Sequence, residues 1–343
     1  MNQSSILTGI KVAWLIIGTT IGAGYASGRE LWEFFGSYGQ KSQWALLLAV
    51  ALFSISCYII MEVGRRLKAV NYRLVLEAII GRRLARLYDG LIFVYLLSTT
   101  VVMLAGSGAA LNHWDFPFWL GVTLTGFLVF IVFLRETNGI LLLNSVLNPV
   151  MLLFLGLACL LFLLKEADAP LPLSPGMPQA IASAMAFTAL NILPLVAVLS
   201  VLGNKLDKTA ALVSAIFSGA CLALLSLLYN QALLSISSTI QQVEVPLLAL
   251  FQNFGLKWLF AVSVVLWLAV YTTAVSNLFG LIGRIQSWLP VSGWLIALIL
   301  ILAMLPLTSF GFTKLIQVLY PLYGVLNLFL LTMILLYPLT KQN

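Results

Sequence analysis

The segment Gly18-Thr19-Thr20-Ile21-Gly22-Ala23-Gly24 interrupts an apolar run over residues 10–35. In hydrocarbon an unpaired backbone N–H or C=O is costly, so such an interruption persists only where protein, water or a bound solute satisfies the freed groups. A second interruption is predicted about 170 residues later, at Thr188-Ala189-Leu190-Asn191-Ile192-Leu193-Pro194. Paired interruptions in matching positions of two halves are typical of a binding site at the membrane midplane.

Composition assigns the broad class of protein. Of the 343 residues, 62% are hydrophobic and 8% are charged, whereas soluble domains carry about 25% charged residues. We therefore expect an integral membrane protein. We attribute the net charge of +7 to the basic loops on one side of the membrane and not to a nucleic-acid-binding surface. No metal or cofactor motif is visible, and the three cysteines lie inside apolar runs, as buried hydrophobes do.

Apolar stretches of about 20 residues predict ten membrane spans, at 8–36, 43–66, 86–111, 117–134, 138–164, 178–203, 208–234, 257–283, 292–309 and 312–338. An even number of spans places both termini on one side. Thirteen of the 18 Lys and Arg residues fall on that side, so the positive-inside rule predicts that both termini are cytoplasmic. The basic segment 67–86 between the second and third spans is expected to be a solvated or headgroup-facing loop, with room for a short amphipathic helix.

The two halves of the chain resemble each other. Asn138-Gly139 followed by Val146-Leu147-Asn148-Pro149 recurs as Phe310-Gly311 followed by Val318-Leu319-Tyr320-Pro321, each displaced by 172 positions. We predict a first five-helix repeat over 1–170 and a second over 171–343, joined by a polar, proline-rich linker. An odd number of spans per copy inverts the second copy relative to the first. The alternative is chance similarity between apolar helices.

The run from Gly18 to Gly36 resembles the opening of the YkvI-type bacterial membrane proteins, relatives of the amino acid-polyamine-organocation superfamily. The resemblance implies the LeuT fold: ten helices in two inverted repeats, with the first and sixth helices broken at a central site. It also implies a multi-pass protein of the bacterial cytoplasmic membrane that acts as a secondary transporter.

The residues around the two interruptions predict a small, uncharged substrate site. Where the first helix resumes after Gly24, its leading N–H groups carry the positive end of a helix dipole, which suits a carboxylate. Glycine permits close approach of a solute to the backbone. The predicted substrate-binding residues are Thr19, Thr20, Gly22, Gly24, Tyr25, Ser27, Phe187, Thr188 and Asn191. Such a lining fits a small zwitterion or neutral polar solute. The alternative for the glycines is close helix packing.

The resemblance also implies a sodium site. In the related fold, a hydroxyl pair in the eighth helix joins backbone carbonyls of the broken first helix. Here the pair would be Thr272 and Thr273, with carbonyls near Gly18 and Ile21. The alternative is that each threonine hydroxyl bonds the carbonyl one turn back. Proton-driven relatives place a lysine in the fifth span, and this chain has Asn144, Ser145 and Asn148 there instead.

Charged residues inside spans are costly, so each one needs a structural or functional reason. Arg29, Glu30 and Glu33 follow the first interruption and form a predicted outer gate, although Arg29 and Glu33 have the spacing of a simple ion pair. Glu62 is expected to pair with the neighbouring arginines. His113 is read as an interfacial residue.

We expect an ion-coupled secondary transporter of a small amino acid or similar solute. The expected mechanism is that of a sodium-driven symporter that works by alternating access and lies among membrane lipids. Proton-coupled or uncoupled transport of another solute stays open as an alternative. So does a non-transporting membrane sensor or scaffold. We expect a transporter and not an enzyme: hydrolytic chemistry is disfavoured, because the sequence has no nucleophile elbow, paired catalytic carboxylates or phosphate-binding loop. An intramembrane enzyme that acts on a lipid-linked substrate stays open as a rival, with Glu30 and Glu33 as its only candidate acids.

Overall fold

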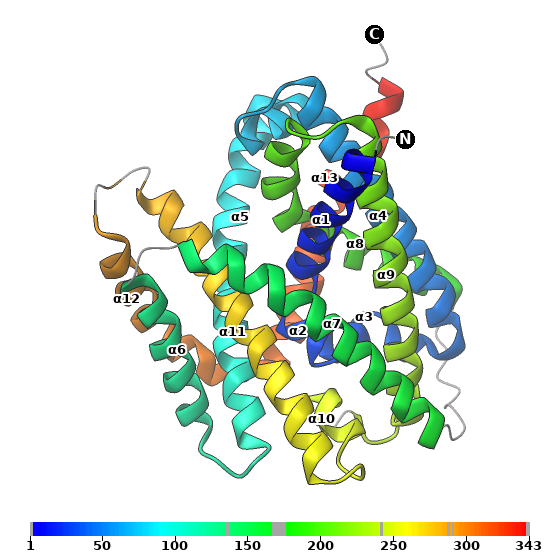
Figure 1. Cartoon of the computed structure of the whole chain (residues 1–343), viewed down its shortest axis with the longest axis vertical. Coiled ribbons are helices and arrows are strands. Elements are labelled where there is room, and N and C mark those ends of the chain that lie inside the picture. Colours follow the sequence, from blue (N-terminus) through cyan, green and yellow to red (C-terminus); the bar gives the residue numbers. More distant parts are fainter. Residues whose placement is uncertain are drawn as a thin grey trace.

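A computed structural model describes residues 3–134, 138–166, 176–240, 243–286, 289 and 291–340, without the side chains of 138–146, 148 and 166. Within these ranges every regular element is a helix. Both termini lie at one end of the molecule (Figure 1). That arrangement agrees with an even number of spans.

Most helices follow the predicted spans closely. The helix of the third span is the exception: it begins at Tyr72, so the basic segment 67–86, expected to be a loop with room for a short helix, is largely helical. The bounds of the first half are α1 Gln3–Thr20, α2 Ala23–Ala26, α3 Arg29–Phe35, η1 Gly36–Lys41, α4 Ser42–Arg66, α5 Tyr72–Asn112, α6 Phe118–Leu134 and α7 Asn138–Glu166. Those of the second half are α8 Met177–Gly203, α9 Lys208–Ser235, α10 Pro246–Leu250, α11 Leu256–Gln286, α12 Gly293–Met304, η3 Leu305–Phe310 and α13 Phe312–Thr340. In the described part of the chain, seven helices are long and apolar enough to cross a membrane, and two shorter apolar helices accompany them.

Helix packing has the symmetry expected of an inverted duplication. The helix of the first span, α1, packs on α9, and α4 packs on α8. These pairs join the first span to the seventh and the second span to the sixth. The two pairs are equivalent when each span of one repeat is matched to the corresponding span of the other. The third and eighth spans, α5 and α11, pack on each other. The predicted boundary between the repeats, and the side chains of Asn144, Ser145 and Asn148, lie outside the described residues.

The pair α4 and α8 is held by close backbone contact. A Cβ added to Gly64 would stand 2.2 Å from the carbonyl oxygen of Ser200, and one added to Gly203 would stand 2.2 Å from that of Met61. Small residues let membrane helices approach this closely, which increases van der Waals contact. Nearby, Glu62 pairs with Arg65 and Arg66 over 2.8 and 2.7 Å, as the sequence predicted.

The predicted interruption of the sixth span is wrong. The helix α8 runs without a break from Met177 to Gly203 and carries Pro194 inside it. Proline removes one backbone hydrogen bond and bends a helix, but neighbouring helices and polar side chains compensate in membranes. Here Thr188 and Asn191 donate to the carbonyls of Ala184 and Phe187, one turn back, over 2.9 and 3.0 Å. These polar residues therefore stay in the helix.

Candidate functional site

The first span is broken where the glycines predicted it. The helix α1 ends at Thr20, and α2 begins at Ala23 after Gly22, which has an extended backbone with φ −95° and ψ −171°. The N–H of Ile21 still donates to the carbonyl of Ile17 over 2.9 Å. Ile21 and Ala23 are buried, so the non-helical backbone of the break lies inside the protein. In Figure 1, α1 enters from the end that holds the termini, and α2 and α3 continue the chain near the centre.

A second interruption follows one turn later, between α2 and α3. Gly28 has φ +80°, a left-handed conformation that favours glycine. The carbonyl of Ala26 accepts a hydrogen bond from the hydroxyl of Tyr229 over 2.8 Å. The carbonyl of Ser27 accepts one from the N–H of Leu247 over 2.9 Å. Two backbone acceptors freed by the interruption therefore have partners from α9 and α10.

A buried polar cluster faces the broken segment. Glu30 of α3 is 4% exposed, and its Oε1 accepts a hydrogen bond from Nδ2 of Asn191 over 3.1 Å. A Cβ added to Gly24 would stand 2.9 Å from Oε2 of Glu30 and 2.9 Å from the hydroxyl of Tyr320. Glycine at position 24 thus brings α2 against a carboxylate from α3, an amide from α8 and a phenol from α13.

The predicted hydroxyl lining is mostly occupied by local hydrogen bonds. Thr19 and Thr20 donate to the carbonyls of Leu15 and Ile16 over 2.8 and 2.9 Å. Ser27 donates to the carbonyl of Gly24 over 2.9 Å.

Two further predicted residues turn toward neighbouring helices. The hydroxyl of Tyr25 meets that of Ser226 in α9 at 2.6 Å, and the hydroxyl of Thr188 donates to the carbonyl of Ala49 in α4 over 3.0 Å. Of the predicted substrate residues, the structure thus gathers Gly24 and Asn191 around Glu30. The roles of the others in substrate binding stay predictions.

Aromatic side chains pack between α3 and α8. The ring of Phe187 in α8 packs edge-on against Phe34 and Phe35 of α3, with centroids 5.6 and 5.0 Å apart. All three side chains are buried. They bind α3 to α8 beside the contact between Glu30 and Asn191.

The threonine pair of the predicted sodium site divides into two roles. The hydroxyl of Thr272 donates to the carbonyl of Leu268 over 2.9 Å, as threonines in membrane helices commonly do. Thr273 faces the break: its Oγ1 lies 3.7 Å from the position of a Cβ added to Gly22. The helices α2 and α11 pack together, so Thr273 and the backbone near Ile21 come from adjacent elements. Gly18 lies in the last turn of α1.

The predicted gate residues separate. Arg29 is buried and pairs with Glu33 over 2.6 Å, the simple ion pair that the spacing indicated. Arg29 also donates to the carbonyls of Ile240 and Val243 over 3.4 and 3.3 Å. Glu30 instead points to Asn191. Arg29 therefore ties α3 to the segment that follows α9, whereas Glu30 belongs to the polar cluster.

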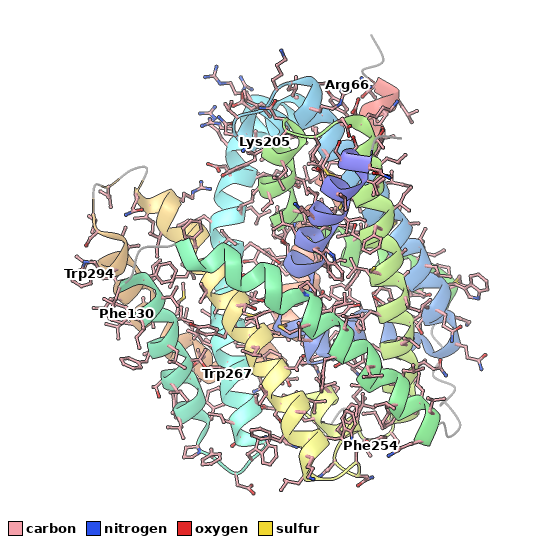
Figure 2. The ribbon with its side chains drawn as sticks, in the orientation of Figure 1. Arg66, Phe130, Lys205, Phe254, Trp267 and Trp294 are labelled. Carbon is pink, nitrogen blue, oxygen red and sulfur yellow. The ribbon has the colours of Figure 1, made fainter. Side chains whose placement is uncertain are left out.

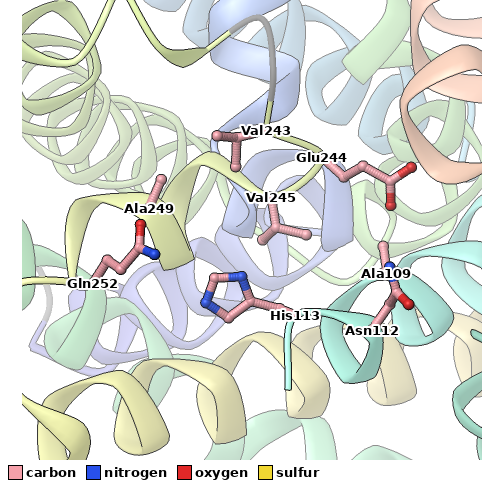
Figure 3. Close-up of a pocket in the computed structure, with 8 residues that line it drawn as sticks. All are labelled: Ala109, Asn112, His113, Val243, Glu244, Val245, Ala249 and Gln252. Carbon is pink, nitrogen blue, oxygen red and sulfur yellow. The ribbon is translucent and has the colours of Figure 1, made fainter. Parts of the chain in front are cut away.

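A cavity of about 270 Å³ lies beside this tie. Figure 3 shows side chains from the end of α5 and from the segment around α10 facing one another across it. The lining residues are Ala109, Asn112, His113, Val243, Glu244, Val245, Ala249 and Gln252. Burial lowers the pKa of His113, and the nearby Asp115 carboxylate offsets part of that effect. Because Val243 also contacts Arg29, the cavity stands next to the far end of the broken helix.

Comparison with known proteins finds relatives along the whole chain. YyaD of Bacillus subtilis (strain 168) is 39% identical over 338 residues, which cover 97% of this chain and 98% of YyaD. The membrane protein YkvI of the same organism is 27% identical over 325 residues, covering 93% and 92%. The chain belongs to the YyaD and YkvI family. No protein-family model matches it.

Solved structures show the fold of this YyaD and YkvI family member. MhsT in complex with L-phenylalanine has a TM-score of 0.71 at 15% identity, covering 100% of this chain and 90% of MhsT. A manganese transporter of Eremococcus coleocola has a TM-score of 0.64 at 16% identity, covering 95% and 78%. Mhp1, a nucleobase-cation-symport-1 family transporter with bromovinylhydantoin bound, has a TM-score of 0.53 at 17% identity, covering 92% and 74%. The chain has the LeuT fold.

Two residues beside the broken helix of this YyaD and YkvI family member, Tyr320 and Tyr229, were not predicted from the sequence. In the sequence, Tyr320 stands out only as part of the repeated motif, beside Pro321. Its signal was a polar aromatic residue next to a proline inside an apolar span, where a hydroxyl needs a partner. Tyr229 carries no comparable signal, because its role depends on which carbonyl the tertiary fold brings to it.

Proposed function

We propose that this protein is a secondary transporter that carries a small zwitterionic solute, an amino acid or a similar compound, by alternating access. One observation carries the proposal: the buried Glu30 and Asn191 face an uncoiled first helix in a chain with the LeuT fold. A buried carboxylate supplies an acceptor for an ammonium group, and hydrogen bonds to charged groups are the stronger ones. The amide of Asn191 and the phenol of Tyr320 supply further polar groups for recognition of the solute.

One further observation supports an organic solute: MhsT, which shares the fold, binds L-phenylalanine.

Alternating access fits the contacts at the two ends of the broken helix. At the end that holds the termini, Ser5 of α1 donates to the carboxylate of Asp207, just before α9. At the other end, Arg29 and the carbonyl of Ser27 bind residues that follow α9. If the contacts at one end break while the contacts at the other end stay formed, the central site opens to one side of the membrane at a time.

Sodium is our proposed coupling ion, because Thr273 lies against Gly22 in the break. A hydroxyl and backbone carbonyls are hard oxygen ligands, which suit a hard cation. The test is uptake into proteoliposomes under an imposed sodium gradient. Thr273→Ala is expected to abolish sodium dependence, whereas Thr272→Ala, which removes a hydroxyl bonded to its own helix, retains it. An unchanged sodium response in Thr273→Ala contradicts the ion site.

Proton coupling is the second candidate, and the burial of Glu30 favours it specifically. A buried carboxylate that faces the transport site can bind and release a proton between the two access states. Uptake driven by a pH gradient without sodium, and lost in Glu30→Gln, supports this candidate over sodium.

The substrate can be sought by measuring the thermal stability of the purified protein against a metabolite library, with and without sodium. A ligand of the folded state raises stability by RT ln(1 + [L]/Kd). A compound that stabilises the protein but is never accumulated in proteoliposomes under either gradient would indicate a membrane sensor with this fold.

A further inference from the structure

A second candidate binding site lies far along the chain from the broken helix, at the start of α5. Gly81 has φ +79° and ψ 161°, and it divides α5 into a first segment, 72–80, and a long second segment. Arginines from both sides of this kink line a pocket of about 310 Å³. They are Arg73, Arg82, Arg83 and Arg86. The end of the molecule that holds them also holds both termini (Figure 1).

The pocket has an excess of positive charge. Arg73 pairs with Glu77 over 3.1 Å. For Arg82, Arg83 and Arg86, no acidic partner occurs among the residues that the structure describes. Exposed arginines scattered over a surface are satisfied by water. Four guanidinium groups that share one concavity repel each other, and an anion placed between them relieves that repulsion.

Apolar side chains flank the arginines. Leu74 and Leu87 are 41% and 66% exposed, and Val70 and Leu84 are also exposed. Exposed apolar groups beside cations are the pattern of a segment at a membrane interface, where acyl chains cover the apolar side chains and headgroups meet the cations. This end is the one that we expect to face the cytoplasm.

The first segment of α5 is also held in place. The hydroxyl of Tyr72 hydrogen-bonds the carboxylate of Asp89, and Arg284 of α11 pairs with that carboxylate over 2.6 Å. Arg284 also donates to the Tyr72 hydroxyl over 3.2 Å. The segment is therefore anchored on the second part of α5 and on α11, so the arginine pocket is a built feature of the fold and not a loose loop.

We propose that this pocket binds a phosphate-bearing anion, and the flanking leucines favour the headgroup of an anionic phospholipid as its source. The guanidinium group donates in a fork that matches two phosphate oxygens, which an ammonium group does not. A bound phosphate bridges the two segments of α5 across Gly81. The site is independent of the transport site proposed above.

The test measures lipid retention by native mass spectrometry and thermal stability of the purified protein in neutral detergent. Phosphatidylglycerol, zwitterionic phosphatidylcholine, glycerol phosphate and inorganic phosphate are titrated separately. Phosphatidylglycerol is expected to bind and stabilise the protein more strongly than phosphatidylcholine. In the combined variant Arg82→Gln, Arg83→Gln, Arg86→Gln its affinity is expected to fall about 100-fold, or roughly fivefold for each basic residue removed. Equal binding of inorganic phosphate and lipid, lost in the same variant, assigns the source to free phosphate.

Matched variants make the result specific. Lys11→Gln, Lys205→Gln, Lys208→Gln removes three exposed cations from the same predicted cytoplasmic side but outside the pocket, and Figure 2 places Lys205 at that end. This control is expected to keep the affinity. The variant Arg82→Lys, Arg83→Lys, Arg86→Lys keeps the charge and is expected to bind with intermediate affinity. It also tests the site if the glutamine variant does not fold. Two results overturn the proposal. One is that the native protein, the Arg→Gln variant and the Arg→Lys variant bind phosphatidylglycerol equally. The other is that the Lys11, Lys205, Lys208 control loses as much affinity as the Arg→Gln variant.

Discussion

Asn191 of α8 donates a hydrogen bond to Glu30 of α3 over 3.1 Å, although the two residues are 161 positions apart. The contact joins the sixth span to the resumed part of the first span. Both side chains are buried, and Gly24 leaves just enough room for Glu30 and Tyr320 beside α2. A carboxylate held in this way at an uncoiled backbone is the feature from which the transport hypothesis follows.

Replacing Glu30 by Gln is expected to weaken binding of an amine-bearing substrate by about 10- to 100-fold, because a charged hydrogen-bond acceptor becomes a neutral one. The measurement is substrate affinity from thermal stability or calorimetry, together with uptake. Glu77→Gln, which removes a carboxylate outside the cluster, serves as the control. Full affinity in Glu30→Gln would show that this carboxylate does not contact the substrate.

Gly24→Ala is expected to impair uptake far more than Gly22→Ala. The added Cβ at position 24 would stand 2.7 Å from Cε2 of Tyr320 and would displace that ring and Glu30, whereas at position 22 the nearest atom is 3.5 Å away. Overpacking of this kind costs about 1 to 3 kcal/mol. The test compares the uptake rates of the two variants at equal protein content. Equal rates contradict the assignment of Gly24 to the site.

Tyr229→Phe is expected to lower stability by about 1 to 3 kcal/mol, because it leaves the buried carbonyl of Ala26 without its hydroxyl donor. Tyr38→Phe is a suitable control, since no hydrogen bond to the Tyr38 hydroxyl occurs among the described residues. Thermal unfolding of both variants in detergent tests the expectation. A loss confined to Tyr229→Phe supports the role of α9 in holding the second interruption.

Gly64→Ala is expected to separate α4 from α8, because a Cβ there would stand 2.2 Å from a backbone oxygen that cannot move independently. We expect a destabilisation of about 3 kcal/mol or less, the usual range for overpacking. Gly90→Ala, with nothing within 4 Å of the added Cβ, is expected to be neutral or stabilising because alanine favours helix. Melting temperatures that shift in the same direction for both variants would refute the close contact.

Stability is expected to fall in acid partly through Asp207. Ser5 and the N–H of Ala210 donate to its carboxylate and lower its pKa below the usual value. A lowered pKa in the folded state means that this contribution is complete above the unfolded pKa of about 3.9 and is lost as the pH falls through the folded value. In a melting-temperature profile from neutral to acid pH, Asp207→Asn is expected to flatten that acid decline. An unaltered profile would contradict the assignment.

Local sequence patterns predicted the elements because their causes are local. The bounds of α4, α6, α8 and α9 lie within one residue of the predicted spans, since apolar length and the polar residues at its ends decide where a helix can cross a membrane. The break at Gly22 was predictable for the same reason: glycine clusters weaken a helix wherever they occur. The break predicted before Pro194 was wrong because α4 and the helix's own carbonyls satisfy the polar groups there, and that depends on packing.

Composition and near neighbours in the chain were enough to predict a membrane protein of ten apolar stretches with an uncoiled first span. The spacing of Arg29 and Glu33 also allowed an ion pair between them, as an alternative to their predicted role in a gate. Helix packing, in contrast, brings Asn191 to Glu30 and Tyr320 close to Gly24, gives the carbonyl of Ala26 its donor in Tyr229, and places four arginines around one pocket. Each buried polar group needs a partner, and residues far apart in the chain come within reach of each other only through the packing of whole helices.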